Sequence, residues 1–153
     1  MVVPQDETTQ FHPNFLSDTQ ALTRWLHHSV AWQVEEIQMF GKRLTVPRQV
    51  AWFGDVGLNY RYSGQPHLAQ GWPSPLLALR EELHQKLEIA SNFVLLNRYR
   101  SGADYMGWHK DDEPSLVGPV ASLPPRVSEH SRPGGSALEL QPTPLVTASS
   151  WCQ

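Results

Sequence analysis

The chain has 153 residues, of which 40% are hydrophobic, 10% aromatic and 18% charged, and its formal net charge is −3. This length is typical of one domain with a substantial core, and the composition excludes a wholly disordered, collagen-like or coiled-coil chain. No apolar run is long enough to cross a bilayer and no signal peptide is visible, so we expect neither secretion nor membrane insertion. The single cysteine, Cys152, excludes an internal disulfide framework. The net charge gives no overall attraction to nucleic acid, so such binding needs a local basic surface.

The composition changes after Leu123. All aromatic residues except Trp151 lie at or before Trp108, and residues 124–153 contain five Pro and five Ser. A globular domain rarely changes so abruptly within its core. We therefore predict a folded part over residues 1–123 and an irregular, disordered tail over residues 124–153.

Residues 17–30 have the pattern of an amphipathic helix. Ser17 is the expected N-cap, and Gln20 completes a capping box three residues later. The apolar positions of the expected helix face are Leu22, Trp25, Leu26 and Val30.

Short strands are expected between residues 32 and 62. The segment 32–40 is strand-like except at Glu35-Glu36, which predicts a bulge or turn. A basic turn over residues 41–43 follows, and residues 50–53 and 58–62 are strand candidates on either side of a turn. Residues 65–73 are expected to form a loop.

A second helix and a strongly alternating strand follow. Ser74 is the expected N-cap with Pro75 at the first helical position, and the leucine spacing predicts a helix to about Ala90. Residues 93–100 alternate, so that one strand face carries Phe93, Leu95, Asn97 and Tyr99, and residues 116–123 are another strand candidate. Two helices with several short strands predict an α+β fold.

The sequence His109-Lys110-Asp111 is the clearest candidate for chemistry. On an extended segment, residues two apart point the same way, so the imidazole and the carboxylate converge. They would supply two of the three ligands of a 2-His-1-carboxylate iron site. The alternative is a solvated loop histidine beside the acidic patch that runs from Asp111 to Glu113.

Several motifs in order give the chain a resemblance to the AlkB family, closest to the DNA-repair subgroup that includes the human homologues two and three. The family consists of Fe(II)- and 2-oxoglutarate-dependent dioxygenases that dealkylate nucleic-acid bases and release succinate, CO2 and formaldehyde. The resemblance implies N-terminal helices followed by part of a double-stranded β-helix, or jelly roll. The motifs are Pro47-Arg48, Gly54-Asp55-Val56-Gly57-Leu58-Asn59-Tyr60, Ser63-Gly64, Asn97-Arg98-Tyr99 and His109-Lys110-Asp111-Asp112-Glu113.

The resemblance assigns roles to individual residues. His109 and Asp111 match catalytic iron ligands, and Asn97 and Tyr99 match residues that, together with His109 at the metal, form the 2-oxoglutarate site. From the residues alone, without the downstream motif, the favoured readings are a core aromatic for Tyr99 and a strand amide that the backbone satisfies for Asn97. Asp112 matches an acidic residue that contacts the damaged base, although a solvated carboxylate is the alternative.

Two further segments match the part of the family fold that surrounds a flipped base. They are Phe40-Gly41-Lys42 and Phe53-Gly54-Asp55, where an aromatic ring would stack on the base and glycine would allow close backbone approach. Phosphate contacts are expected from Lys42, Arg43, Arg48 and Arg61, with ordinary surface charge as the alternative reading for each.

The resemblance stops after Leu123. Family members continue with further strands, a distal histidine ligand and an arginine that binds 2-oxoglutarate, whereas here His130 follows Asp111 by only 19 residues. We therefore expect a frame shift or truncation near residue 123, a partial jelly roll, and little or no demethylase activity from this chain.

The partners expected from the resemblance are alkylated DNA, with RNA as a second substrate, and dioxygen, bound by a monomer. We expect the protein in the cytoplasm of a bacterium or the nucleus of a eukaryote. The alternatives are a non-catalytic fragment that keeps a nucleic-acid-binding face, and a dioxygenase that acts on RNA or protein.

Overall fold

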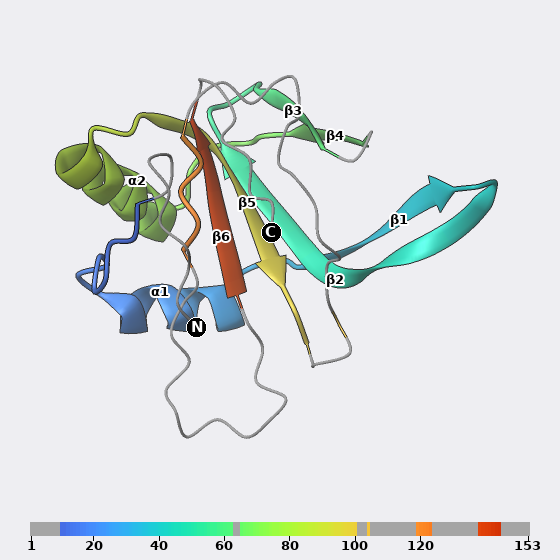
Figure 1. Ribbon diagram of the computed structural model, residues 1–153, viewed down its shortest axis with the longest axis horizontal. Coiled ribbons are helices and arrows are strands. Elements are labelled where there is room, and N and C mark those ends of the chain that lie inside the picture. Colours follow the sequence, from blue (N-terminus) through green and yellow to red (C-terminus); the bar gives the residue numbers. More distant parts are fainter. Residues whose placement is uncertain (1–9, 63–64, 101–103, 105–118, 124–137, 145–153) are drawn as a thin grey trace.

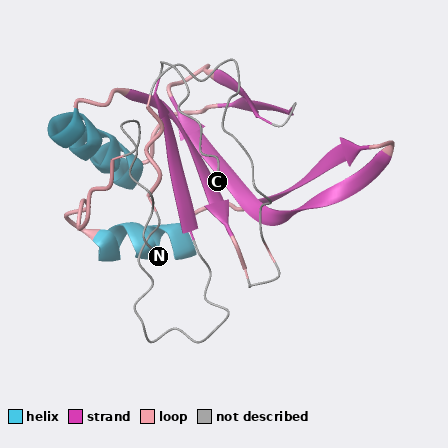
Figure 2. Ribbon diagram, in the orientation of Figure 1, coloured by secondary structure: helices cyan, strands magenta, loops and turns pink. Residues whose placement is uncertain are grey.

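The computed structural model describes residues 10–62, 65–100, 104, 119–123 and 138–144. In these ranges the chain forms an antiparallel sheet in the order β1-β2-β5-β6, a two-stranded sheet of β3 and β4, and two helices (Figures 1 and 2). The expected α+β class is confirmed, and the described strands do not close into a barrel. The elements are α1 (Thr19–His28), β1 (Gln33–Met39), β2 (Lys42–Gly54), β3 (Asn59–Tyr62), β4 (Gln65–Leu68), α2 (Ser74–Leu87), β5 (Ser91–Arg98) and β6 (Leu138–Pro144).

Helix α1 begins one residue later than the capping box predicted. Asp18 is the N-cap, and its carboxylate accepts a hydrogen bond of 2.9 Å from the backbone N–H of Ala21. Ser17 does not cap the helix because both its backbone N–H and its hydroxyl donate to Glu82 on α2. The apolar face is as predicted, since Leu22 and Leu26 are buried in the core.

Strands β1 and β2 form a long hairpin that projects from the molecule (Figure 1). Phe40 and Gly41 form its turn with φ values of 51° and 74°, the left-handed conformation that two-residue hairpin turns require. The register changes between Val34 and Glu36, which confirms the predicted bulge. The prediction that β2 spans only residues 50–53 is wrong, because pairing with β1 extends the strand through polar residues back to Lys42.

Residues 65–68 form β4 and pair with β3, so the prediction of a loop there is wrong. The strand was not visible in the sequence because its inward-facing residue is His67, which is polar but only 1% exposed. Strand periodicity is recognised from apolar residues at buried positions, and here the buried position carries an imidazole.

Helix α2 contains Ser74 as its first residue rather than as its N-cap. Pro73 is the N-cap and makes no side-chain hydrogen bond, while Pro75 lies in the first turn, where a missing N–H is tolerated. The buried face of Leu76, Leu79 and Leu83 is as predicted. The helix ends at Leu87, before the expected Ala90, because Glu88 adopts the left-handed conformation with φ of 57°.

Strand β5 lies inside the sheet and is buried on both faces, which confirms the alternation read from the sequence. Val94 and Leu96 pack in the core cluster that includes the leucines of α1 and α2. Phe93 and Leu95 pack in a second cluster with Val50, Tyr60 and Ala69. The helices therefore cover one face of the sheet, and the β3–β4 hairpin with the loop after it packs against the other.

Strand β6 pairs with β5 and lies within the segment that the sequence predicted to be irregular. Its seven residues are the only ones of 124–153 that the structure describes, so the predicted irregular tail stays a prediction for the rest of that segment. Their composition hid the strand, because two prolines are rare inside a sheet. Of the strand predicted over 116–123, the described residues 119–123 show a single bridge residue, Leu123, and no continuous strand.

Candidate functional site

Asn97 is a buried polar residue on the central strand of the sheet. It is 1% exposed and pairs with Val50 of β2 on one side and Glu139 of β6 on the other. Its side-chain oxygen has no hydrogen-bond partner among the described residues. A buried polar atom without a partner is costly in a folded protein, and a bound ligand is one explanation for its presence. Among the described residues, no backbone group satisfies this oxygen as the alternative from the sequence would require.

Tyr99 follows the end of β5 and is partly buried. It is two residues beyond Asn97, as expected for two side chains that act together, but it lies past the last strand residue, Arg98.

Arg100 and Asp104 pair just beyond the end of this strand. The Asp104 carboxylate accepts the backbone N–H of Arg100 at 2.9 Å and two guanidinium hydrogen bonds at 2.8 and 3.1 Å. These hydrogen bonds and the opposite charge lower the pKa of Asp104 and raise that of Arg100. The pair links the end of the strand that carries Asn97 to the segment that leads to the predicted iron ligands.

The predicted iron ligands His109 and Asp111, and the predicted base contact Asp112, lie outside the described residues. Among the residues that the structure does describe, no group of three or more His, Cys, Asp and Glu side chains could hold a metal ion. The sequence prediction for these three residues therefore stays a prediction.

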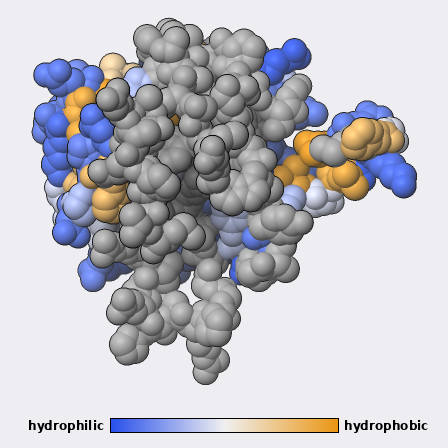
Figure 3. Space-filling view, viewed as in Figure 1, coloured by the Kyte–Doolittle hydropathy of each residue, from blue (hydrophilic) through white to orange (hydrophobic). Residues whose placement is uncertain are grey.

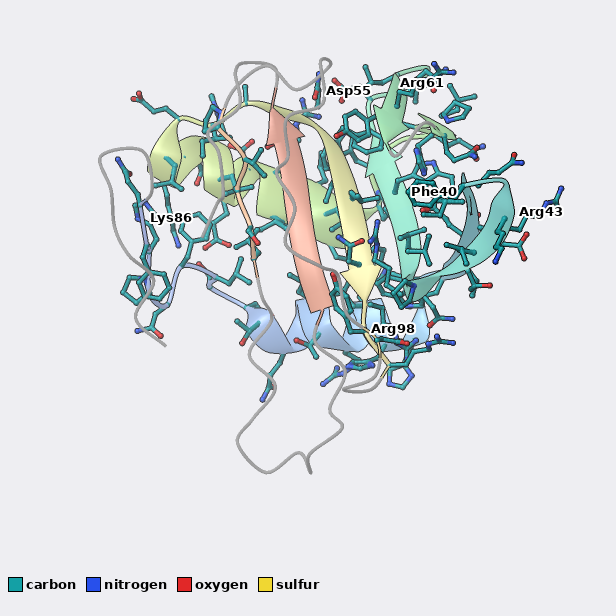
Figure 4. All side chains as sticks on the ribbon, turned by 45° about the vertical axis from the view of Figure 1, so that its right-hand side comes forward. Phe40, Arg43, Asp55, Arg61, Lys86 and Arg98 are labelled. Carbon is teal, nitrogen blue, oxygen red and sulfur yellow. The ribbon has the colours of Figure 1, made fainter. Side chains whose placement is uncertain are left out.

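The residues predicted to bind the base fall into two groups at opposite ends of β2. Phe40, Gly41 and Lys42 lie at the tip of the β1–β2 hairpin, and Phe40 is 96% exposed. Phe53, Gly54 and Asp55 lie at the other end of the same strand, roughly 40 Å further along its path. Figure 4 shows Phe40 and Asp55 well apart in the molecule. The structure does not bring the two groups together.

Phe53 and Gly54 have packing roles that explain their presence. The Phe53 ring lies 5.8 Å from the Trp25 ring and packs against the helix-side core. Gly54 is buried, and a Cβ there would lie 2.6 Å from the carbonyl oxygen of Asn92. Close approach of β5 therefore requires glycine at this position.

Asp55 binds α2 and the segment before it. Its carboxylate accepts hydrogen bonds from Trp72 Nε1 at 2.8 Å and from Arg80 at 3.0 Å. The Arg80 guanidinium also lies 5.0 Å from the centre of the Trp72 ring. These contacts fix the loop between β2 and β3 against α2.

The predicted phosphate-binding residues differ in exposure. Lys42, Arg43 and Arg61 are exposed, and Figure 4 shows Arg43 and Arg61 on the side of the molecule where both hairpins project. Arg48 is 3% exposed, so the alternative reading of ordinary surface charge is wrong for this residue, and the phosphate contact stays a prediction. Arg48 lies on the buried face of β2 together with Val46 and Val50.

Two contacts near these residues were not predicted. His67 Nε2 and Glu35 Oε1 lie 2.6 Å apart, and the Arg98 guanidinium lies 5.8 Å from the Trp32 ring. Their partners are far apart in the sequence, so no spacing rule finds them. The one available signal was the break in alternation at Glu35-Glu36.

The comparison with family models decides the family. Residues 8–124 match the model of the 2OG-Fe(II) oxygenase superfamily. The chain belongs to this superfamily. Membership implies Fe(II) and 2-oxoglutarate, and the match ends next to Leu123, where the composition changes.

The chain is also similar to curated proteins that are named as AlkB homologues. The DNA oxidative demethylase ALKBH2 of Homo sapiens is 40% identical over 57% of this chain and 34% of its own length. ALKBH2 of Arabidopsis thaliana is 30% identical over 65% of this chain and 32% of its own length. The alpha-ketoglutarate-dependent dioxygenase alkB homolog 3 of Homo sapiens is 30% identical over 69% of this chain and 37% of its own length.

The chain therefore spans about a third of the length of the curated relatives it matches. By superfamily membership the chain is related to Fe(II)/2-oxoglutarate dioxygenases. No helix that the structure describes is both long enough and apolar enough to span a membrane.

Proposed function

We propose that this chain carries the co-substrate-binding and nucleic-acid-binding parts of a dioxygenase that removes alkyl groups from nitrogen atoms of DNA bases. The observation that carries the proposal is the buried Asn97 amide, whose oxygen has no described partner. It occupies the position where the AlkB resemblance expects a 2-oxoglutarate contact. The similarity to proteins named DNA oxidative demethylase supports DNA as the substrate.

The described residues fit a co-substrate that carries carboxylates. Rotation about the Cβ–Cγ bond of Asn97 exchanges its oxygen and its NH2 group, so the amide can present a donor to a carboxylate. The Tyr99 hydroxyl would supply a second donor. Burial of Asn97 keeps competing water from the amide, which strengthens such a hydrogen bond.

His109 and Asp111 would hold Fe(II) through an imidazole nitrogen and a carboxylate oxygen, the donor types of a facial iron site. Bound iron and 2-oxoglutarate together supply the oxidising chemistry that hydroxylates an N-alkyl carbon. We further infer that the β1-β2-β5-β6 sheet is part of a double-stranded β-helix, which the superfamily match supports.

The β1–β2 hairpin is the proposed nucleic-acid contact. Its tip exposes the Phe40 ring next to Lys42 and Arg43, a combination of stacking surface and positive charge that suits single-stranded or distorted DNA. Val34 and Leu44 are also half exposed along the hairpin. Figure 3 shows apolar and polar side chains mixed on this projection.

The Asn97→Leu variant tests the co-substrate site. We expect 2-oxoglutarate affinity to fall at least about tenfold, because leucine has a similar volume but lacks the amide. The free energy of unfolding should stay the same or rise by about 1 kcal/mol, since an unpaired buried oxygen is removed. Titration calorimetry with Mn(II) in place of iron measures the first quantity, and urea denaturation measures the second.

Asn92→Leu, on the same strand, is the matched control and should leave the 2-oxoglutarate affinity unchanged. The proposal is contradicted if the Asn97→Leu variant keeps its affinity for 2-oxoglutarate but loses several kcal/mol of stability. The amide would then stabilise the fold rather than bind the co-substrate.

The second candidate function is non-catalytic nucleic-acid binding. The observation that favours it is that residues 124–153 contain a single histidine, His130, which follows Asp111 too closely to match the distal iron ligand of the family. We expect this chain to bind less than one iron per molecule and to release little succinate. Iron stoichiometry together with coupled succinate release on methylated DNA separates the two functions, and robust coupled turnover contradicts the second.

A further inference from the structure

Glu35 and His67 form a buried contact between two hairpins that belong to different sheets. His67 Nε2 lies 2.6 Å from Glu35 Oε1, and the two side chains are 1% and 14% exposed. Glu35 is on β1 and His67 on β4. The separation of 2.6 Å is that of a hydrogen bond, which an ionised Glu35 carboxylate would accept from Nε2–H.

The bulge in the first hairpin allows this contact. The register passes from Val34 opposite Gln49 to Glu36 opposite Thr45, so residues 46–48 lie opposite the single residue Glu35. A bulge redirects the side chain at the irregular position. Here the redirected carboxylate meets the imidazole of the second hairpin.

The imidazole is also held from β2. The Trp52 ring packs edge-on against the His67 ring, with 4.5 Å between centroids and an interplanar angle of 84°. Trp52 Nε1 donates a hydrogen bond of 3.2 Å to the carbonyl oxygen of Leu68. Strand β4 is thus attached to both strands of the first hairpin, and the pair with Glu35 is the charged part of that attachment.

We propose that Glu35 and His67 are positioning residues that hold the β1–β2 and β3–β4 hairpins in one orientation, so that both contact the same DNA strand. The proposal rests on the function proposed above. Both hairpins project from the same side of the molecule (Figure 1), and Figure 4 shows Phe40 and Arg43 of the first and Arg61 of the second on that side.

Energetics favour a positioning role over a purely stabilising one. Desolvation offsets most of the attraction within a buried ion pair, so an apolar pair of similar size is often as stable. An apolar pair, however, lacks the directional hydrogen bond that fixes one hairpin relative to the other. A double variant with an apolar pair should therefore keep the stability of the fold but lose the fixed orientation of the two hairpins.

The experiment measures binding of a fluorescein-labelled DNA oligonucleotide with one N-methylated base to the full chain, by anisotropy. Glu35→Gln keeps an acceptor for His67 and should bind within about twofold of the wild type. His67→Leu leaves Glu35 unpaired and should lower both stability and affinity. The double variant Glu35→Leu/His67→Leu should regain stability but bind DNA roughly tenfold more weakly than the wild type.

Leu79→Ala is the control for lost stability alone, because this residue of α2 is buried in the core cluster on the face of the sheet that the helices cover. It should unfold more easily and bind DNA normally. Wild-type affinity in the double variant overturns the proposal.

Hydrogen exchange separates this proposal from the one on which it rests. At matched stability, the backbone amides of β4 should exchange roughly tenfold faster in the double variant than in the wild type. Faster exchange in a chain that does not bind DNA would refute the proposed function and leave the positioning role standing. Unchanged exchange would refute the positioning role whatever the DNA result.

Discussion

Gly54 shows at the scale of one residue how a matched motif is also explained by packing. A Cβ at this position would lie 2.6 Å from the Asn92 carbonyl oxygen and 3.1 Å from the Phe93 Cα. Both are backbone atoms of the central strand, which cannot move without disturbing the sheet pairing. Gly41 differs, because a Cβ added there would have no atom within 4 Å. Only the backbone conformation, with φ of 74°, is unfavourable for a residue with a side chain.

Gly54→Ala should therefore cost more than Gly41→Ala. We expect the free energy of unfolding to fall by about 2–4 kcal/mol for Gly54→Ala, from steric overlap in the sheet. Gly41→Ala should cost about 1–2 kcal/mol, from the left-handed backbone alone. Urea denaturation of both variants measures the difference, and equal losses would show that strand β5 yields more easily than its burial implies.

At the scale of elements, Glu82 joins the segment before α1 to α2. Its carboxylate accepts hydrogen bonds from the Ser17 N–H at 3.0 Å and from the Ser17 hydroxyl and Lys86 at 2.5 Å each. Lys86 also donates to the Phe15 carbonyl oxygen at 2.6 Å. Burial tends to raise the pKa of Glu82, but the bonds from Lys86 and Ser17 outweigh it and lower the pKa below the usual 4.5. Figure 4 shows Lys86 on the side opposite Phe40.

This lowered pKa predicts a pH dependence of stability. A carboxyl group with a lowered pKa in the folded state stabilises the fold above about pH 4.5, and the contribution is lost as the pH falls through the folded-state pKa. Glu82→Gln should be less stable than the wild type by about 1 kcal/mol at pH 7. The difference should shrink between pH 5 and pH 3, as measured by urea denaturation at each pH. A constant difference would show that the charge of Glu82 is unimportant.

At the tip of the β1–β2 hairpin, we expect a substitution to change DNA affinity without changing the free energy of unfolding. Phe40→Ala should change the free energy of unfolding by less than about 0.5 kcal/mol, because the ring is almost fully exposed. DNA affinity should fall by the equivalent of about 1–3 kcal/mol, the usual contribution of one aromatic ring stacked on a base. Anisotropy with labelled DNA measures the affinity. The control is Phe11→Ala, another exposed phenylalanine outside the hairpin, which should bind normally.

At the scale of the whole molecule, the sheet is a layer with the helices on one face and the β3–β4 hairpin on the other. Strand β5 is the centre of this arrangement, because it pairs with β2 and β6 and contributes to both core clusters. Strand β6 covers the edge of β5 that would otherwise expose unpaired backbone groups.

A chain that ends after residue 137 lacks β6 and should be less stable and more prone to aggregate than the full chain. A chain that ends after residue 144 keeps β6 and should behave as the full chain does. Urea denaturation and light scattering compare the three. Equal stability of the shortest chain would show that pairing between β5 and β6 contributes little.

Local patterns predicted much of this arrangement. The apolar faces of both helices and the alternation of β5 follow from the periods of helix and strand, which depend only on neighbouring residues. The bulge near Glu35 was visible as a break in alternation. Asn97 was identified as a polar residue among apolar ones, together with the AlkB resemblance, and the structure adds that its oxygen has no described partner.

The sequence by itself determined the superfamily and the α+β class, and it predicted which residues would bind iron and co-substrate, because these depend on short motifs and on local periodicity. Only the tertiary structure decided that Arg48 is buried and that Asp55 binds Arg80. It also decided that Glu35 meets His67 and that β6 pairs with β5 within a segment expected to be irregular. The physical reason is that burial and pairing depend on residues distant in the chain, so a polar side chain has the same local signature whether it faces water or a partner.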